Sequence, residues 1–165
     1  MNWLVYSMEI SVLLVLFAGF VTAAITRDPR NFVSDFPPEI QKVYYASQNI
    51  PVPKTTFTAR ELLRKILFSL ALMFLLAWMA KRAGARGYLQ GFFVIFSYLA
   101  AIAAFDTFIL DWIFFPRIRR WRLPGTEHMD REYRVKWFHL KVVLQVSPLF
   151  LVYALLTAGI FIWLF

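Results

Sequence analysis

The stretch VVLQVSPLFLVYALLTAGIFIWLF, residues 142–165, decides the fold, because it contains no ionised side chain over 24 residues. A bilayer core of about 30 Å requires about 20 helical residues. Three further uncharged stretches are Ile10–Thr26, Ile66–Ala80 and Gly87–Phe105. We therefore predict an all-α integral membrane protein, a four-transmembrane-helix bundle in a single membrane domain, residues 1–165. The expected spans are approximately 3–26, 62–80, 88–112 and 140–165.

Composition supports a membrane protein. Hydrophobic residues make up 60% of the chain, and the mean hydropathy is +0.59. The net charge of +8 is carried mainly by the loops, where it suits anionic lipid headgroups better than nucleic acid. We expect membrane lipids as partners and no nucleic acid. The absence of cysteine excludes disulfides and thiolate chemistry.

The distribution of lysine and arginine predicts the orientation in the membrane. The first loop with its flanks holds seven of them, the third holds eight, and the second holds three. Because basic loops stay in the cytoplasm, loops one and three should be cytoplasmic and both termini outside. The expected location is a bacterial or archaeal plasma membrane. The short basic segment AKRAGAR in the second loop argues against this orientation.

The two long loops, residues 27–58 and 116–138, are expected to contain short interfacial helices. In the first loop, EIQKVYY places Ile40, Val43 and Tyr44 on one helical face. Such a helix can lie in the headgroup layer or form a lid between spans. Thr58 and Glu61 fit a capping box at the start of the second span. In the third loop, Leu123-Pro124-Gly125-Thr126 fits a type II turn.

The third loop begins with a run of alternating basic and apolar residues that can bind phosphate groups or a protein partner. The alternative is that these arginines only fix the orientation at the membrane boundary. The predicted lipid-binding or partner-binding residues are Arg117, Arg119, Arg120, Trp121 and Arg122.

Ionisable residues inside spans are the other candidates for function, because each is costly to insert into a membrane. They are Glu9, Asp106 and Asp111. α-Helical geometry places Asp106 and Asp111 about 140° apart, so that only one of them can face a given partner. We expect Asp106 to point inward, either in an ion-pair layer with Asp111, Arg64 and Lys65, or as a catalytic candidate with His139. The intramembrane carboxylate Glu9 is either a proton or cation site or a shallow group that reaches water.

No metal site is predicted, because the histidines and carboxylates show no HExxH-type or HxxxH-type spacing. No cofactor is predicted either. A haem would need His128 and His139 as ligands, and they lie in a polar loop and at a helix start.

Three functions remain open. The first is a non-catalytic accessory or assembly subunit that binds anionic lipid or a protein partner through its basic third loop. The second is a membrane enzyme that uses Asp106 and His139 on a phosphorylated lipid headgroup at the cytoplasmic face. The third is a small transporter that works as a homo-oligomer, because four helices enclose little volume.

Overall fold

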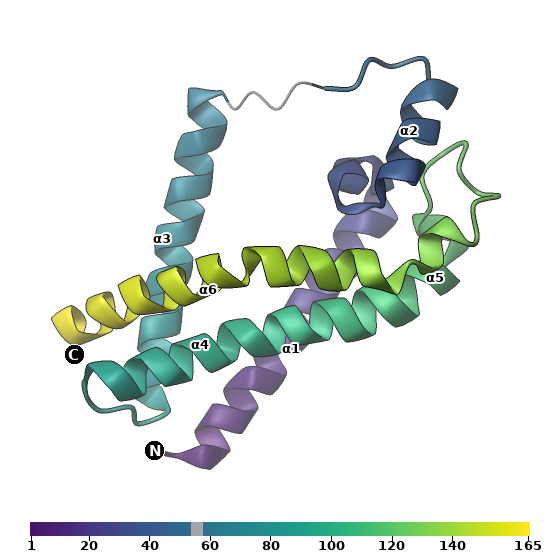
Figure 1. Cartoon of the computed structure of the whole chain (residues 1–165). Coiled ribbons are helices and arrows are strands. Elements are labelled where there is room, and N and C mark those ends of the chain that lie inside the picture. The colour runs from purple at the N-terminus through teal and green to yellow at the C-terminus, as the bar shows by residue number, and fades with distance from the viewer. Residues whose placement is uncertain (54–57) are drawn as a thin grey trace. The chain divides into compact units, whose positions relative to one another are not determined.

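The computed structural model describes residues 1–53 and 58–165, and every regular element in them is helical (Figure 1). Four helical segments are long and apolar enough to cross a membrane: Trp3–Arg27, Ala59–Arg82, Gly87–Arg117 and Lys136–Leu164. An all-α chain with four long apolar helices is thus confirmed. The predicted bundle and the interfacial position of the short helices stay predictions. Lys54, one of the basic residues counted for the first loop, lies outside the described residues.

The chain forms two compact units. The terminal unit contains Met1–Leu14, Lys54–Ile102 and Val146–Phe165. The loop unit contains Val15–Pro53 and Ala103–Gln145. Helix α1 (Trp3–Arg27) and helix α6 (Lys136–Leu164) contribute residues to both units.

The terminal unit packs helix α3 (Ala59–Arg82) and helix α4 (Gly87–Phe105) with the end of α6 around small side chains. Gly91 shows how closely α4 and α6 approach, because a Cβ atom there would lie 2.7 Å from Phe161 Cδ1. Asn2 N donates to the Ala83 carbonyl oxygen at 2.7 Å and ties the start of α1 to the end of α3. The buried members of this core are Leu76, Ala77, Met79, Ala80, Ala83, Ala85, Val94, Ile95, Tyr98, Ala154, Ala158 and Phe161.

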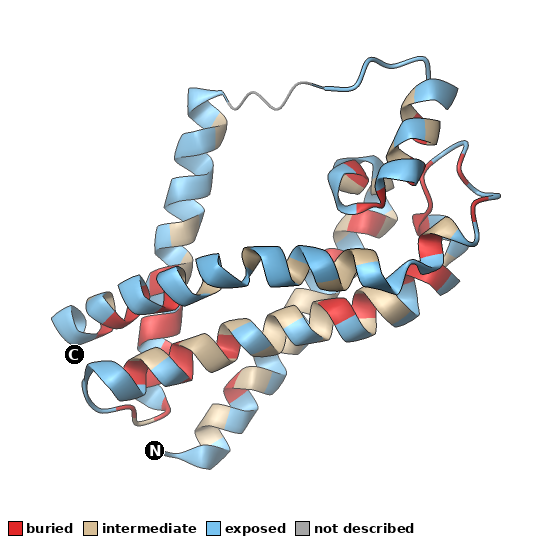
Figure 2. Cartoon of the chain, in the orientation of Figure 1, coloured by how far each residue is buried: buried red, intermediate tan, exposed pale blue. Residues whose placement is uncertain are grey.

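Helix α3 begins with the predicted capping box. Glu61 N donates to Thr58 Oγ1 at 3.3 Å, and Thr58 N donates to Glu61 Oε2 at 3.0 Å. The helix contains no buried residue from Ala59 to Ala71, and this part is mostly coloured as exposed in Figure 2. Apolar side chains without protein cover are expected where a helix faces lipid.

In the loop unit, the two long loops contain short helices. The first loop contains the 3₁₀ segment η1 (Pro29–Asp35) and helix α2 (Pro38–Ser47). The face predicted for α2 is confirmed, with Ile40 and Tyr44 buried. The third loop follows helix α5 (Phe115–Arg117) and contains the 3₁₀ segments η3 (Arg119–Trp121) and η4 (Glu132–Arg134).

Candidate functional site

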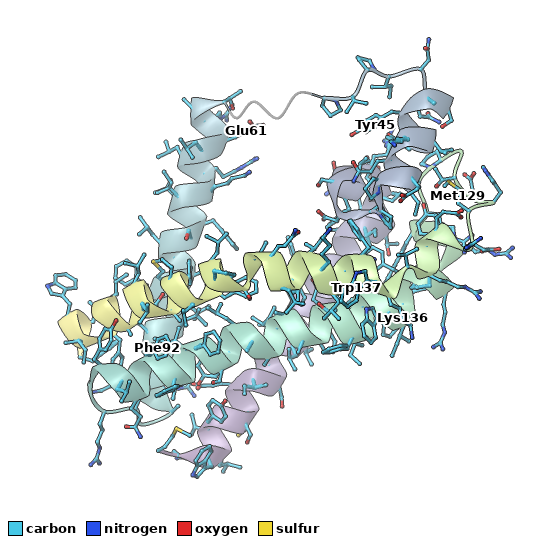
Figure 3. The ribbon with its side chains drawn as sticks, in the orientation of Figure 1. Tyr45, Glu61, Phe92, Met129, Lys136 and Trp137 are labelled. Atoms are coloured by element: carbon cyan, nitrogen blue, oxygen red, sulfur yellow. The ribbon has the colours of Figure 1, made fainter. Side chains whose placement is uncertain are left out.

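The two long loops pack against each other over a hydrophobic core of their own. We call residues 28–53 and 117–135, which lie in the loop unit, the cap. Trp121 Nε1 donates to Thr26 Oγ1 at 2.9 Å and thereby fastens the third loop to the end of α1. Met129, labelled in Figure 3, belongs to the same core. The buried residues of this core are Val21, Ile25, Val33, Phe36, Ile40, Tyr44, Leu110, Phe115, Trp121, Leu123, Met129 and Tyr133.

Arg122 lies inside the third loop and is only 5% exposed. Its guanidinium donates to the Glu127 carbonyl oxygen at 2.6 Å and to the Pro116 carbonyl oxygen at 3.4 Å. It also pairs with Asp130 at 2.5 Å and stacks 4.9 Å from the centre of the Tyr133 ring. Arg122 therefore connects the two ends of the loop and holds them together.

A buried hydroxyl network shapes the centre of the same loop. The Tyr133 hydroxyl accepts from Leu123 N at 2.9 Å and lies 2.7 Å from Thr126 Oγ1. Thr126 N donates to the Leu123 carbonyl oxygen at 3.1 Å, and Gly125 has φ +83°. Both features agree with the predicted type II turn, which requires a positive φ at its third residue. Burial raises the pKa of the Tyr133 hydroxyl above its ordinary value, which keeps it protonated.

Three of the five predicted binding residues, Arg117, Arg119 and Arg120, are at the surface. Trp121 and Arg122 are buried instead. None of the three surface arginines forms an ion pair with a carboxylate in the described part of the chain. They are thus available to an external anion.

Two tryptophans, Trp112 and Trp137, lie on either side of the third loop. Trp112 Nε1 donates to the Lys136 carbonyl oxygen at 3.2 Å, and Lys136 Nζ lies 5.2 Å from the centre of the Trp112 ring. Trp137 is strongly exposed at the start of α6, next to Lys136 (Figure 3). Tryptophan and lysine favour the headgroup layer. Arg117, Arg119 and Arg120 follow Trp112 by five to eight residues.

The carboxylates of the third span lie on a π-helical segment, η2 (Asp106–Phe114). Its hydrogen bonds join residues five apart, so the angle between Asp106 and Asp111 around the helix axis is smaller than in an α-helix. The expected separation of about 140° was wrong, because it assumed α-helical geometry. The two carboxylates interact electrostatically.

His139 on α6 is close to Asp111. Its Nδ1 lies 3.0 Å from Asp111 Oδ2, and both side chains are largely buried. A carboxylate beside Nδ1 favours a proton on that nitrogen and leaves Nε2 for proton exchange. Asp106 and Asp35, the last residue of η1, also interact electrostatically with this pair. Loss of water contact and the Asp111 charge raise the pKa of Asp35, although part of Asp35 remains exposed.

The structure does not test the predicted ion-pair layer. Arg64 and Lys65 lie on α3 in the terminal unit, whereas Asp106 and Asp111 lie in the loop unit. Pairing of Asp106 with either base stays a prediction. In the described residues, no group of three or more His, Cys, Asp or Glu side chains has the geometry to hold a metal ion.

Glu9, in the terminal unit, is buried. The Tyr98 hydroxyl donates to Glu9 Oε2 at 2.7 Å, and Arg82 Nε lies 3.6 Å from Glu9 Oε1. Sequence reasoning missed both partners, as well as the proximity of Asp35 to Asp111. A tyrosine in the middle of a span was the one available signal for Tyr98, because its hydroxyl needs a hydrogen-bond partner there.

No family model, no curated protein and no solved structure matches this chain. Its function therefore has to be inferred from its own residues.

Proposed function

We propose that this protein is a non-catalytic membrane subunit whose cap binds the phosphate groups of anionic lipids. The observation that carries the proposal is the position of Arg117, Arg119 and Arg120. They lie at the surface, directly before the buried residues Trp121 and Arg122. Buried neighbours hold the backbone of this segment in place, so less conformational entropy is lost when the arginines bind.

Arginine is suited to this role because its planar guanidinium donates paired hydrogen bonds to phosphate. Trp112 and Trp137 support a position of this segment near the headgroup layer, because tryptophan is enriched there. The excess of basic residues in loops one and three predicts that this is the cytoplasmic side, where anionic lipids attract basic segments. A protein partner with an acidic surface would use the same three arginines.

The test measures lipid binding to the purified full chain. Native mass spectrometry in detergent compares phosphatidylglycerol with phosphatidylcholine for the wild type and for a variant with Arg117, Arg119 and Arg120 replaced by glutamine. Basic residues near an anionic surface contribute about 1 kcal/mol each, so the triple variant should lose about 3 kcal/mol, or roughly 100-fold in affinity. Phosphatidylcholine binding should not change.

A matched control replaces Lys42, Arg60 and Arg86 by glutamine. These exposed residues lie on α2, on α3 and between α3 and α4, and their replacement removes the same charge. The control should keep most of the phosphatidylglycerol binding. Equal losses in both triple variants would show that binding depends only on net charge. Unchanged binding in the variant that lacks Arg117, Arg119 and Arg120 would remove the proposal.

A second candidate function is an enzyme that acts on a phosphorylated lipid headgroup. The Asp111–His139 pair favours it, because a carboxylate beside an imidazole is a common arrangement for general base catalysis. His139 lies at the start of α6 and Asp111 near the end of the third span, and these positions suit a headgroup substrate. Asp111 contacts His139, and Asp106 interacts electrostatically with both, so this candidate uses Asp111 beside the predicted Asp106 and His139.

This candidate is tested by incubating the protein with phosphatidic acid and measuring released phosphate. Activity that His139→Gln abolishes and the Lys42, Arg60 and Arg86 control preserves would support an enzyme. Absence of release from the folded wild type would remove phosphatidic acid as its substrate.

A further inference from the structure

Glu9 has one carboxylate oxygen without a hydrogen-bond donor. The residue is 8% exposed, and its Oε2 accepts from the Tyr98 hydroxyl at 2.7 Å. Its Oε1 is buried and receives no hydrogen bond from the described residues. A buried acceptor without a donor destabilises the folded chain, and an ionisable residue within a span is a candidate functional group. Oε1 thus keeps an unused acceptor position, which its neighbours cover in this structure.

Arg82 is the nearest cation to this oxygen, but it is loosely held. Arg82 Nε lies 3.6 Å from Glu9 Oε1, beyond hydrogen-bonding distance, and its side chain is 52% exposed. On its other side, the guanidinium carbon lies 4.7 Å from the centre of the Trp78 ring. A position between a carboxylate and the face of a tryptophan is one that attracts organic cations.

The other polar groups nearby are occupied by one another. The Tyr6 hydroxyl donates to Ser97 Oγ at 2.7 Å, and Ser97 Oγ donates to the Val94 carbonyl oxygen at 2.6 Å. The Tyr6 ring lies 5.4 Å from the Tyr98 ring. A metal cation such as Ca²⁺ takes roughly six to eight oxygen ligands. Near Glu9, few oxygen atoms are free to serve as such ligands. Aromatic rings and a single free oxygen suit an organic cation better.

We infer that Glu9, Trp78 and Tyr98 form a binding site for a small organic cation, an ammonium or guanidinium group, whose position Arg82 occupies in this structure. An N–H of the bound cation would donate to Glu9 Oε1, and the Trp78 ring would cover its other side. The half-exposed Arg82 side chain, at the end of α3, would move into solvent to make room. This site lies in the terminal unit and does not depend on the function proposed for the cap.

The test measures binding of methylguanidinium to the full chain in nanodiscs of uncharged lipid, followed by the NMR signal of the Trp78 indole N–H. Arg82→Ala should raise the affinity at least tenfold, because it removes the competing cation. Arg82→Lys keeps that cation and serves as the matched control, with an affinity close to that of the wild type. Glu9→Gln should abolish binding.

Two further probes define the ligand class. Tetramethylammonium carries no N–H donor, so it should bind at least tenfold more weakly than methylguanidinium. Sodium ions at the same ionic strength should not compete. An Arg82→Ala protein that binds methylguanidinium no better than the wild type would overturn the inference, and so would sodium that competes equally well. If Glu9→Gln does not fold, the change in methylguanidinium affinity in Arg82→Ala still decides whether the inference holds.

Discussion

Replacement of Arg122 by alanine should open the cap locally. Arg122 makes a short charged hydrogen bond to the Glu127 carbonyl oxygen, a half-exposed ion pair with Asp130 and a stacking contact with Tyr133. A hydrogen bond from a charged group is worth about 1.5–3 kcal/mol, and a cation–π contact about 0.5–1 kcal/mol. The ion pair adds little, because its Asp130 side is 54% exposed. Relief of the unsatisfied Arg122 Nε offsets part of the loss. We expect a net loss of about 2 kcal/mol in the free energy of local opening.

Hydrogen exchange of the peptides that cover residues 119–134, read by mass spectrometry in nanodiscs, measures this quantity. About 2 kcal/mol corresponds to about a 30-fold increase in the opening equilibrium. Arg120→Ala is the matched control, because Arg120 is the exposed second neighbour of Arg122 and should change exchange less than threefold. Exchange in Arg122→Ala that stays within threefold of this control would show that the buried contacts do not hold the loop.

Three other predictions follow from the packing and charge of named residues. Gly91→Ala should lower the free energy of unfolding by about 1–3 kcal/mol, because its Cβ would meet Phe161. Gly159→Ala is the control and should leave the free energy of unfolding unchanged, because the space around Gly159 is open. Thermal unfolding of the two variants compares them. Gly125→Ala combines a positive φ with a clash against the end of α2, so it should increase exchange in both loops of the cap, and unaltered exchange in α2 would contradict the clash. The Arg122 partner lowers the pKa of Asp130, so their pair should stabilise the cap above the ordinary aspartate pKa of 3.8 and lose this contribution as the pH falls through the lowered value. Hydrogen exchange, corrected for the pH dependence of the intrinsic amide exchange rate, measures that loss. The loss should be absent in Asp130→Asn.

Features that depend on local sequence were predicted well. The long apolar runs predicted four helices because each can satisfy its own backbone hydrogen bonds in lipid. The capping box at Thr58 and the turn at Gly125 involve residues within three positions of each other, so their chemistry is visible in the sequence. The same holds for α2, whose apolar spacing placed Ile40 and Tyr44 inward.

Features that depend on distant contacts were not predictable in the same way. A run of arginines gives no sign that Arg122 turns inward, because its partners Glu127 and Asp130 become neighbours only when the loop folds. The π-helical segment is equally hidden, and it changes which side of the helix carries Asp111. The contact between Glu9 and Tyr98 joins residues 89 positions apart, which no local pattern encodes.

The burial of Arg122 affects the two uses of its charge differently. As a binding group it is unavailable, because its donors are directed to the loop itself, so the cap presents fewer arginines than the sequence suggests. As an orienting charge it still counts, because the bias of basic residues acts while the helices insert. The loop would then be unfolded and its arginines unpaired. The predicted orientation therefore keeps its full count of basic residues, whereas the lipid-binding proposal depends only on the arginines that remain exposed in the folded cap. Removing Arg122 should leave the orientation unchanged while it loosens the segment that presents Arg119 and Arg120.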